Sequence, residues 1–183
     1  MSYFELERNI SIELLDPAMA KDVFKLIDNN RHFLSQWLSW PAFTKKPSDF
    51  ESFALAQQQL FDEGKGMTFI IRFHDHIVGV AGFNEIIQDR QLATVGYWLA
   101  EHAQGKGIIT TVCRELIRIA FEDLNLSKVQ LSAAEHNVSS RRVAERLGMA
   151  YEGCISHAEN VNGNILSHAV YGLLKPTADV NRT

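Results

Sequence analysis

The chain has 183 residues, 46% of them hydrophobic, and a formal net charge of −4. This length fits one ordinary domain, and the hydrophobic fraction is sufficient for a continuous core. The negative charge argues against a long nucleic-acid surface, and no apolar run reaches the roughly 18 residues of a membrane helix. The N-terminal residues lack a signal-peptide pattern, so we expect a cytoplasmic protein that binds neither membranes nor nucleic acid.

The first half of the chain predicts strands at its two ends and helices between them. In chain order the elements are a strand over 10–14, a helix from Pro17, a short helix near 31–37, a helix over 48–63, and strands over 67–73 and 77–83. Asp16 before Pro17 is typical of a helix start, and Ser48 with Glu51 predicts a capping box. A tight turn at 74–76 makes the last two strands a hairpin.

The second half predicts alternating strands and helices, followed by two closing strands. In chain order the elements are a strand over 92–100, a helix over 108–124, a strand over 129–134, a helix ending at Gly148, and strands near 151–156 and 168–174. The long helix rests on a 3.6-residue period of apolar residues, and the turn residues of 159–164 predict a loop. We therefore expect one domain over 1–176, with about seven strands, and a mobile tail over 177–183.

Two cysteines and seven histidines show no metal-ligand spacing. Cys113 and Cys154 lie far apart in the sequence, and each falls in a segment with an apolar pattern. We expect both thiols to be buried and reduced. The sequence therefore predicts chemistry that needs no metal.

The segment from Gln104 to Thr110 is the most informative part of the sequence. It reads Gln-Gly-Lys-Gly-Ile-Ile-Thr and joins a predicted strand to a predicted helix. Glycines let the backbone turn sharply, and a helix N-terminus offers unpaired N–H groups, so this junction predicts a phosphate site. It is not a Walker loop, because glycine follows Lys106, and it is not a dinucleotide motif, because Thr110 occupies the third glycine position.

A second motif, Asn-x-x-Ser followed by a helix that ends in Leu-Gly, occupies 137–148. In this order and at this spacing the two motifs resemble the GNAT superfamily of acetyl-CoA-dependent N-acetyltransferases. The phosphate loop of that family, Gln/Arg-x-x-Gly-x-Gly/Ala, maps onto Gln104, Gly107 and Ile109. The last position departs from the family pattern, because isoleucine replaces a small residue.

The resemblance extends over nearly the whole chain. The segments 31–41 and 95–99 are similar to the branch that acetylates ribosomal proteins at N-terminal serine or alanine, the RimJ/RimL type. The resemblance implies an α/β (α+β) fold in a single GNAT-type domain, with a mixed central sheet of about seven strands flanked by helices and splayed central parallel strands. It also implies acetyl-CoA as the co-substrate and direct acetyl transfer in a ternary complex.

The family fold places the cofactor along the loop and the strand before it. The pyrophosphate is expected on the loop N–H groups and the pantetheine arm along the edge of Trp98 and Leu99. The backbone N–H near Leu99 is the candidate oxyanion donor, whereas sheet packing is the alternative for both side chains. The residues implied in cofactor binding are Trp98, Leu99, Gln104, Gly105, Lys106, Gly107, Ile108, Ile109, Thr110, Asn137 and Ser140. Arg141 and Arg142 are candidates for the 3′-phosphate.

The catalytic residues are predicted with alternatives. Ser140 is the candidate proton donor to the leaving thiolate, and the alternative is that it only caps a helix. Glu85, near the end of a predicted strand, is the leading candidate for a general base, with Glu135 and His136 as alternatives. A water relay is a further option, because an α-amine with a pKa of about 7.7–8.0 is already partly neutral at pH 7.

The acceptor is the least determined part of the prediction. Trp37 and Trp40 are candidates for its pocket or, alternatively, for the core. The leading hypothesis is the N-terminal α-amine, on Ser or Ala, of a ribosomal protein. The alternatives are a small amine such as a polyamine, an amino sugar or an antibiotic, and a non-catalytic module that binds acyl-CoA. A homodimer is compatible with each hypothesis.

Overall fold

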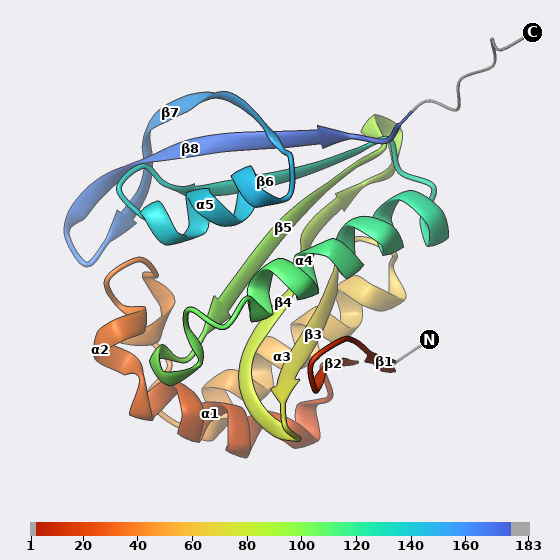
Figure 1. Ribbon diagram of the computed structural model, residues 1–183. Helices are drawn as coiled ribbons and strands as arrows, with labels where there is room; N and C mark the ends of the chain where they lie inside the picture. The colour runs from red at the N-terminus through yellow and green to blue at the C-terminus, as the bar shows by residue number, and fades with distance from the viewer. Residues whose placement is uncertain (1–2, 177–183) are drawn as a thin grey trace, which may run out of the picture.

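The computed structural model describes residues 3–176, and Figure 1 shows one sheet with helices on both faces. The strands are β1 (Tyr3–Glu5), β2 (Ile10–Leu14), β3 (Met67–Phe73), β4 (His76–Ile87), β5 (Leu92–Leu99), β6 (Lys128–Ala134), β7 (Ala150–Val161) and β8 (Asn164–Leu174). The helices are α1 (Ala20–Asn29), α2 (Arg31–Leu34), α3 (Pro47–Asp62), α4 (Ile108–Arg118) and α5 (Val138–Arg146). The tail predicted over 177–183 lies outside the described residues.

The eight strands follow the order β1-β2-β3-β4-β5-β6-β8-β7. Neighbouring strands are antiparallel except β5 and β6, which run parallel and pair only over 92–95 and 128–131. Beyond these residues the two strands separate, as the widening space between them in Figure 1 shows. The predicted mixed sheet with splayed central parallel strands is confirmed.

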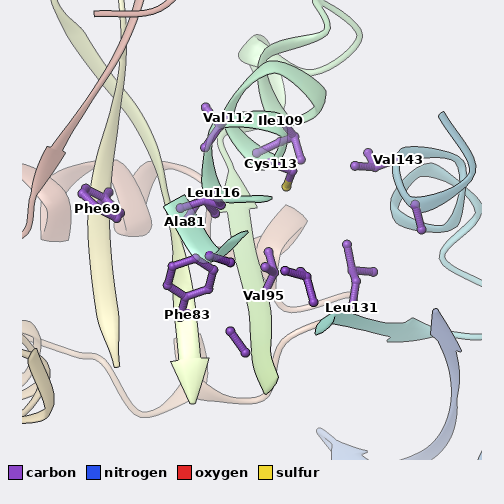
Figure 2. Close-up of a cluster of buried hydrophobic side chains, with 14 of the residues drawn as sticks. Phe69, Ala81, Phe83, Val95, Ile109, Val112, Cys113, Leu116, Leu131 and Val143 are labelled. Carbon is purple, nitrogen blue, oxygen red and sulfur yellow. The ribbon is translucent and has the colours of Figure 1, made fainter. Parts of the chain in front are cut away.

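The sheet separates two hydrophobic clusters. α4 and α5 cover one face, where Figure 2 shows Leu116 of α4 directed toward Phe83 and Val95 of the sheet. α1, α2 and α3 cover the other face and bury a smaller cluster that includes Phe50 and Ile70. Because helices cover β3 and β4 on both sides, these strands bury consecutive residues instead of alternating ones.

The long helix starts where the sequence predicts. Gly107 precedes α4 with a φ of +77°, a left-handed conformation that glycine adopts without a steric penalty. A π-helical turn over Ile119–Asp123 continues the helix, so the predicted helix over 108–124 is almost fully formed. The chain thus passes from the C-terminal end of β5 through a glycine turn into α4.

Two local predictions change in the structure. The sheet has one strand more than the predicted seven, because β1 has three residues, too few to show an alternating pattern. The predicted capping box at Ser48 and Glu51 is wrong, because α3 already begins at Pro47. Asp49 supplies the cap: its Oδ2 accepts hydrogen bonds from the N–H groups of Lys45 and Lys46, at 2.8 and 3.1 Å.

The last two strands are longer than predicted. Their pairing continues to Val161 and Asn164, with a turn at Asn162-Gly163, so the predicted loop over 159–164 is largely strand. β7 lies at the edge of the sheet and is exposed along most of its length. The prediction of a buried Cys154 is therefore wrong, whereas Cys113 of α4 is buried as predicted.

Candidate active site

Two cavities open where β5 and β6 separate. The loop cavity, of about 680 Å³, is lined by 104–110 and by α5. The aromatic cavity, of about 900 Å³, is lined by Trp40, Phe43, Phe50 and Phe53 together with residues of β4, β5 and β6. The residues common to both cavities are Trp37, Leu38, Tyr97, Trp98, Asn137 and Ser140. A molecule in one cavity therefore reaches a molecule in the other at the separation of the two strands.

The phosphate loop predicted from the sequence lines the loop cavity along its whole length. All seven residues of 104–110 belong to the lining, and Gly105 shares the left-handed conformation of Gly107. The first backbone hydrogen bond of α4 runs from the Thr111 N–H to the Gly107 carbonyl, at 3.1 Å. The N–H groups of 108–110 therefore lack a partner within the helix, which is the arrangement that binds phosphate.

The two cavities carry opposite charge. The basic side chains that line the loop cavity are Lys106, Arg142 and Arg146. The titratable side chains that line the aromatic cavity, apart from Tyr97, are Asp49, Glu159 and His168. Among the described lining residues, the loop cavity has no Asp or Glu and the aromatic cavity has no Lys or Arg. The loop cavity thus suits an anion and the aromatic cavity an ammonium group.

The backbone of β5 presents Leu99 to the gap between the strands. The Ala100 N–H donates to the Val78 carbonyl at 2.8 Å. Hydrogen bonds alternate along an antiparallel pair, so the N–H and carbonyl of Leu99 point away from β4 and toward β6. The Leu99 carbonyl accepts a hydrogen bond from the Gln104 side chain at 3.1 Å. The Leu99 N–H remains as a donor beside the loop cavity, which Leu99 lines.

Asn137 caps α5, whereas the Ser140 hydroxyl is free of a capping role. Asn137 is the N-cap of α5, and its Oδ1 accepts a hydrogen bond from the Ser140 N–H at 3.2 Å. Ser140 lines both cavities, and its hydroxyl forms no hydrogen bond with the described residues. The cap therefore does not need the Ser140 hydroxyl.

Tyr97 holds α5 against β5, a role that sequence reasoning missed. Its hydroxyl donates to the Ser140 carbonyl at 3.4 Å. Burial, with a smaller contribution from the nearby Cys113, raises the pKa of the Tyr97 phenol well above its ordinary value. The phenol therefore keeps its proton at neutral pH and serves as a hydrogen-bond donor, not as a base.

Glu159, one of the two carboxylates that line the aromatic cavity, was also missed by sequence reasoning. Glu159 Oε2 lies 3.4 Å from His168 Nε2, and Glu159 Oε1 accepts a hydrogen bond from the Ser39 hydroxyl at 2.9 Å. The Asn-Gly pair at 162–163 is the sequence signal that could have found it. A two-residue hairpin turn there pairs Glu159 with Leu166 and brings it near His168.

The predicted base candidates lie elsewhere. The ladder between β4 and β5 shifts by one residue between Phe83 and Glu85. Asn84, within this bulge, lines the aromatic cavity, whereas Glu85 lines neither cavity. Glu135 and His136 are exposed in the turn after β6 and also line neither cavity. A one-residue bulge redirects every side chain beyond it, and the sequence pattern does not reveal it.

The remaining candidates are partly brought together. Trp37 lines both cavities, and Trp40 lines the aromatic cavity with its ring centroid 5.9 Å from that of Trp98. Arg142 lines the loop cavity. Arg141 instead donates to the Tyr171 hydroxyl at 2.9 Å and to the Glu135 carbonyl at 3.0 Å, which holds its guanidinium against β6 and β8.

The sequence matches the model of the acetyltransferase (GNAT) domain over residues 10–150. The chain belongs to the GNAT family. It is 33% identical to YdaF of Bacillus subtilis (strain 168), over 93% of this chain and 94% of that protein. It is also 33% identical to the ribosomal-protein-serine acetyltransferase of Escherichia coli (strain K12), over 86% of this chain and 88% of that protein.

A solved structure supports the same fold. The RimL ribosomal L7/L12 alpha-N-protein acetyltransferase, in complex with coenzyme A, superposes with a TM-score of 0.91 at 23% identity, over 94% of this chain and 98% of that chain. The predicted fold is thus confirmed, and so is the predicted enzyme class, an N-acetyltransferase. Within 3–176, no helix is long and apolar enough to cross a membrane, and no three His, Cys, Asp or Glu side chains gather as metal ligands would.

Proposed function

We propose that this GNAT enzyme acetylates the N-terminal α-amine of a protein, and that the acceptor is a ribosomal protein of the cytoplasm. The observation that carries the proposal is the meeting of a basic cavity and an acidic cavity at Trp98 and Ser140. Acetyl-CoA is an anion and an amine acceptor is a cation. The basic loop cavity therefore favours acetyl-CoA, and the acidic aromatic cavity favours the amine. The identity with the serine acetyltransferase of E. coli supports a protein acceptor.

The cofactor occupies the loop cavity in this proposal. Its pyrophosphate lies on the N–H groups of 108–110, with Lys106, Arg142 and Arg146 supplying positive charge. Its pantetheine arm follows the exposed edge of β5 at Trp98 and Leu99. The thioester then reaches the place where both cavities meet.

The transfer proceeds by direct attack. The amine nitrogen bonds to the thioester carbonyl carbon, and the Leu99 N–H stabilises the resulting oxyanion. The C–S bond breaks, and the Ser140 hydroxyl, directly or through a water, donates a proton to the departing thiolate. Glu159, oriented by Ser39 and His168, accepts the proton that the amine loses. Glu159 therefore replaces Glu85 as the candidate base.

No acetyl-enzyme forms in this mechanism. Burial raises the pKa of the Cys113 thiol to about 12, so it is not a nucleophile at neutral pH. Cys154 lies exposed on the edge strand β7 and lines neither cavity. Both cysteines are therefore unsuited to carry the acetyl group.

The aromatic cavity is suited to the end of a polypeptide. Phe43 at its wall is 76% exposed and Phe53 is 43% exposed, which gives a chain leaving the cavity an apolar surface to contact. An α-amine is easier to deprotonate than a lysine amine, whose pKa is about 10.4 against about 7.7–8.0. A free N-terminus is therefore the preferred nucleophile.

The test uses two matched peptides. One has a free N-terminal Ser or Ala and no lysine, and the other has a blocked N-terminus and one internal lysine. We expect acetyl transfer, measured by mass spectrometry and thiol release, to the first peptide only. Faster acetylation of the blocked peptide would overturn the proposal. If small amines are acetylated and neither peptide is, the protein is a small-molecule acetyltransferase instead.

A further inference from the structure

The turn between β1 and β2 lies beside the phosphate loop and is fixed on two sides. Glu7 Oε1 accepts a hydrogen bond from Thr111 Oγ1 of α4 at 3.3 Å and lies 3.7 Å from Arg114 Nη1. On the other side, the His74 N–H donates to the Asn9 carbonyl at 2.9 Å. The turn is thus held between the first turns of α4 and the turn that joins β3 to β4.

Arg8 stands at the tip of this turn, between the two anchors. The position that a Cβ atom on Gly107 would take lies 3.9 Å from Arg8 Nη1. Arg8 is exposed and forms no hydrogen bond or ion pair with the described residues. Its φ of +61° is uncommon for a long side chain, since Asn or Gly is preferred in this conformation.

The charges around Gly107 are mainly positive. Lys106 Nζ lies 5.3 Å from the centroid of the Phe73 ring, and Arg146 Nε donates to Thr110 Oγ1 at 3.3 Å. The nearest carboxylate of the turn, on Glu7, is already paired with Arg114. An anion on the loop N–H groups would therefore meet cations from the turn, the loop and α5.

We propose that Arg8 binds the cofactor pyrophosphate, so that the phosphate site has a second wall supplied by the N-terminal hairpin. The inference rests on the proposed function, because acetyl-CoA is the ligand. A guanidinium donates charge-assisted hydrogen bonds to phosphate oxygens. Arg8 lies beside Gly107, where the backbone comes close to the pyrophosphate, and this position favours that group over the 3′-phosphate.

The test is Arg8→Asn, which removes the cation and keeps a residue that accepts positive φ. Calorimetry should show acetyl-CoA binding weakened about tenfold, with the melting temperature equal to or above that of the wild type. The KM for acetyl-CoA should rise while kcat changes little. Arg90→Gln is the matched control and should bind like the wild type, because this exposed residue precedes β5 and lies at the opposite end of that strand from the loop 104–110.

A second ligand separates the two phosphates. If Arg8 binds the pyrophosphate, Arg8→Asn weakens the binding of acetyl-CoA and of its 3′-dephospho analogue by the same factor. A loss confined to acetyl-CoA would overturn this assignment in favour of the 3′-phosphate. Equal acetyl-CoA affinity of wild type and Arg8→Asn would overturn the role of Arg8 alone, whereas a wild type that binds no acetyl-CoA would overturn the proposed function itself.

Discussion

The loop cavity and the aromatic cavity share a wall but differ in charge and in construction. The loop cavity takes most of its lining from one continuous segment, 104–110, and from α5, and its charged side chains are basic. The aromatic cavity combines side chains from segments between 37 and 168, with Asp49 and Glu159 as its carboxylates. Because of this difference, we expect variants in the loop cavity to weaken cofactor binding and variants in the aromatic cavity to impair activation of the acceptor.

The largest effect is expected on the acceptor side. Glu159→Gln removes the candidate base, and loss of general-base assistance lowers kcat by about 100-fold or more. Binding of acetyl-CoA, measured by calorimetry, should not change, because Glu159 does not line the loop cavity. The control is Glu152→Gln, because Glu152 lies on the same strand but forms an ion pair with Lys128. A kcat equal to that of the wild type would remove Glu159 from the mechanism.

On the cofactor side, Gly107→Val should weaken acetyl-CoA binding at least tenfold, or about 1.4 kcal/mol. The left-handed φ of Gly107 is strained for valine, and the loop N–H groups must shift to relieve that strain. Gly64→Val is matched for strain, because its φ is +67° and nothing lies within 4 Å of its added Cβ. Calorimetry on both variants separates phosphate binding from general destabilisation, and equal affinities would contradict the assignment.

Substitution of Ser140, which lines both cavities, should change kcat more than it changes the binding of acetyl-CoA. Ser140→Ala removes the candidate proton donor and should lower kcat by about tenfold, more than it raises the KM for acetyl-CoA. The melting temperature should stay unchanged, since Asn137 provides the cap, and Asn137→Ala should lose about 1 kcal/mol of stability. Ser139→Ala, which borders only the loop cavity, is the kinetic control. A lower melting temperature with unchanged kcat in Ser140→Ala would leave Ser140 a structural role only.

The smallest effect concerns the core behind the loop cavity. The raised pKa of Cys113, about 12 in the folded state, means that the unfolded chain releases this proton first as pH rises. The thiol contribution to stability is therefore complete below about pH 8.5 and is lost as pH rises toward 12. Chemical denaturation across this range should show a flatter pH dependence for Cys113→Ala than for Cys154→Ala. The same slope in both variants would contradict the assigned shift.

The lining of the loop cavity could be predicted in detail because its determinants are local. Glycine at the start of a helix, unpaired N–H groups and the 3.6-residue period of α4 all follow from neighbouring residues, and the structure confirms their arrangement around Gly107. The splayed strands were expected from the family resemblance, and β5 and β6 show them. The roles of single residues in binding and catalysis stay predictions.

What the sequence determined by itself is the family, the order of the elements and the glycine turn that lines the loop cavity, since these depend on contiguous residues. Only the tertiary structure decided which carboxylates line the aromatic cavity. A bulge in β4 turns Asn84 instead of Glu85 toward the aromatic cavity, and the long β7–β8 hairpin brings Glu159 to His168. Arg8 comes within reach of Gly107 for the same reason. Arg8 and Gly107, like Ser39 and Glu159, lie about 100 positions or more apart in the chain, and no local pattern encodes contacts between such distant residues.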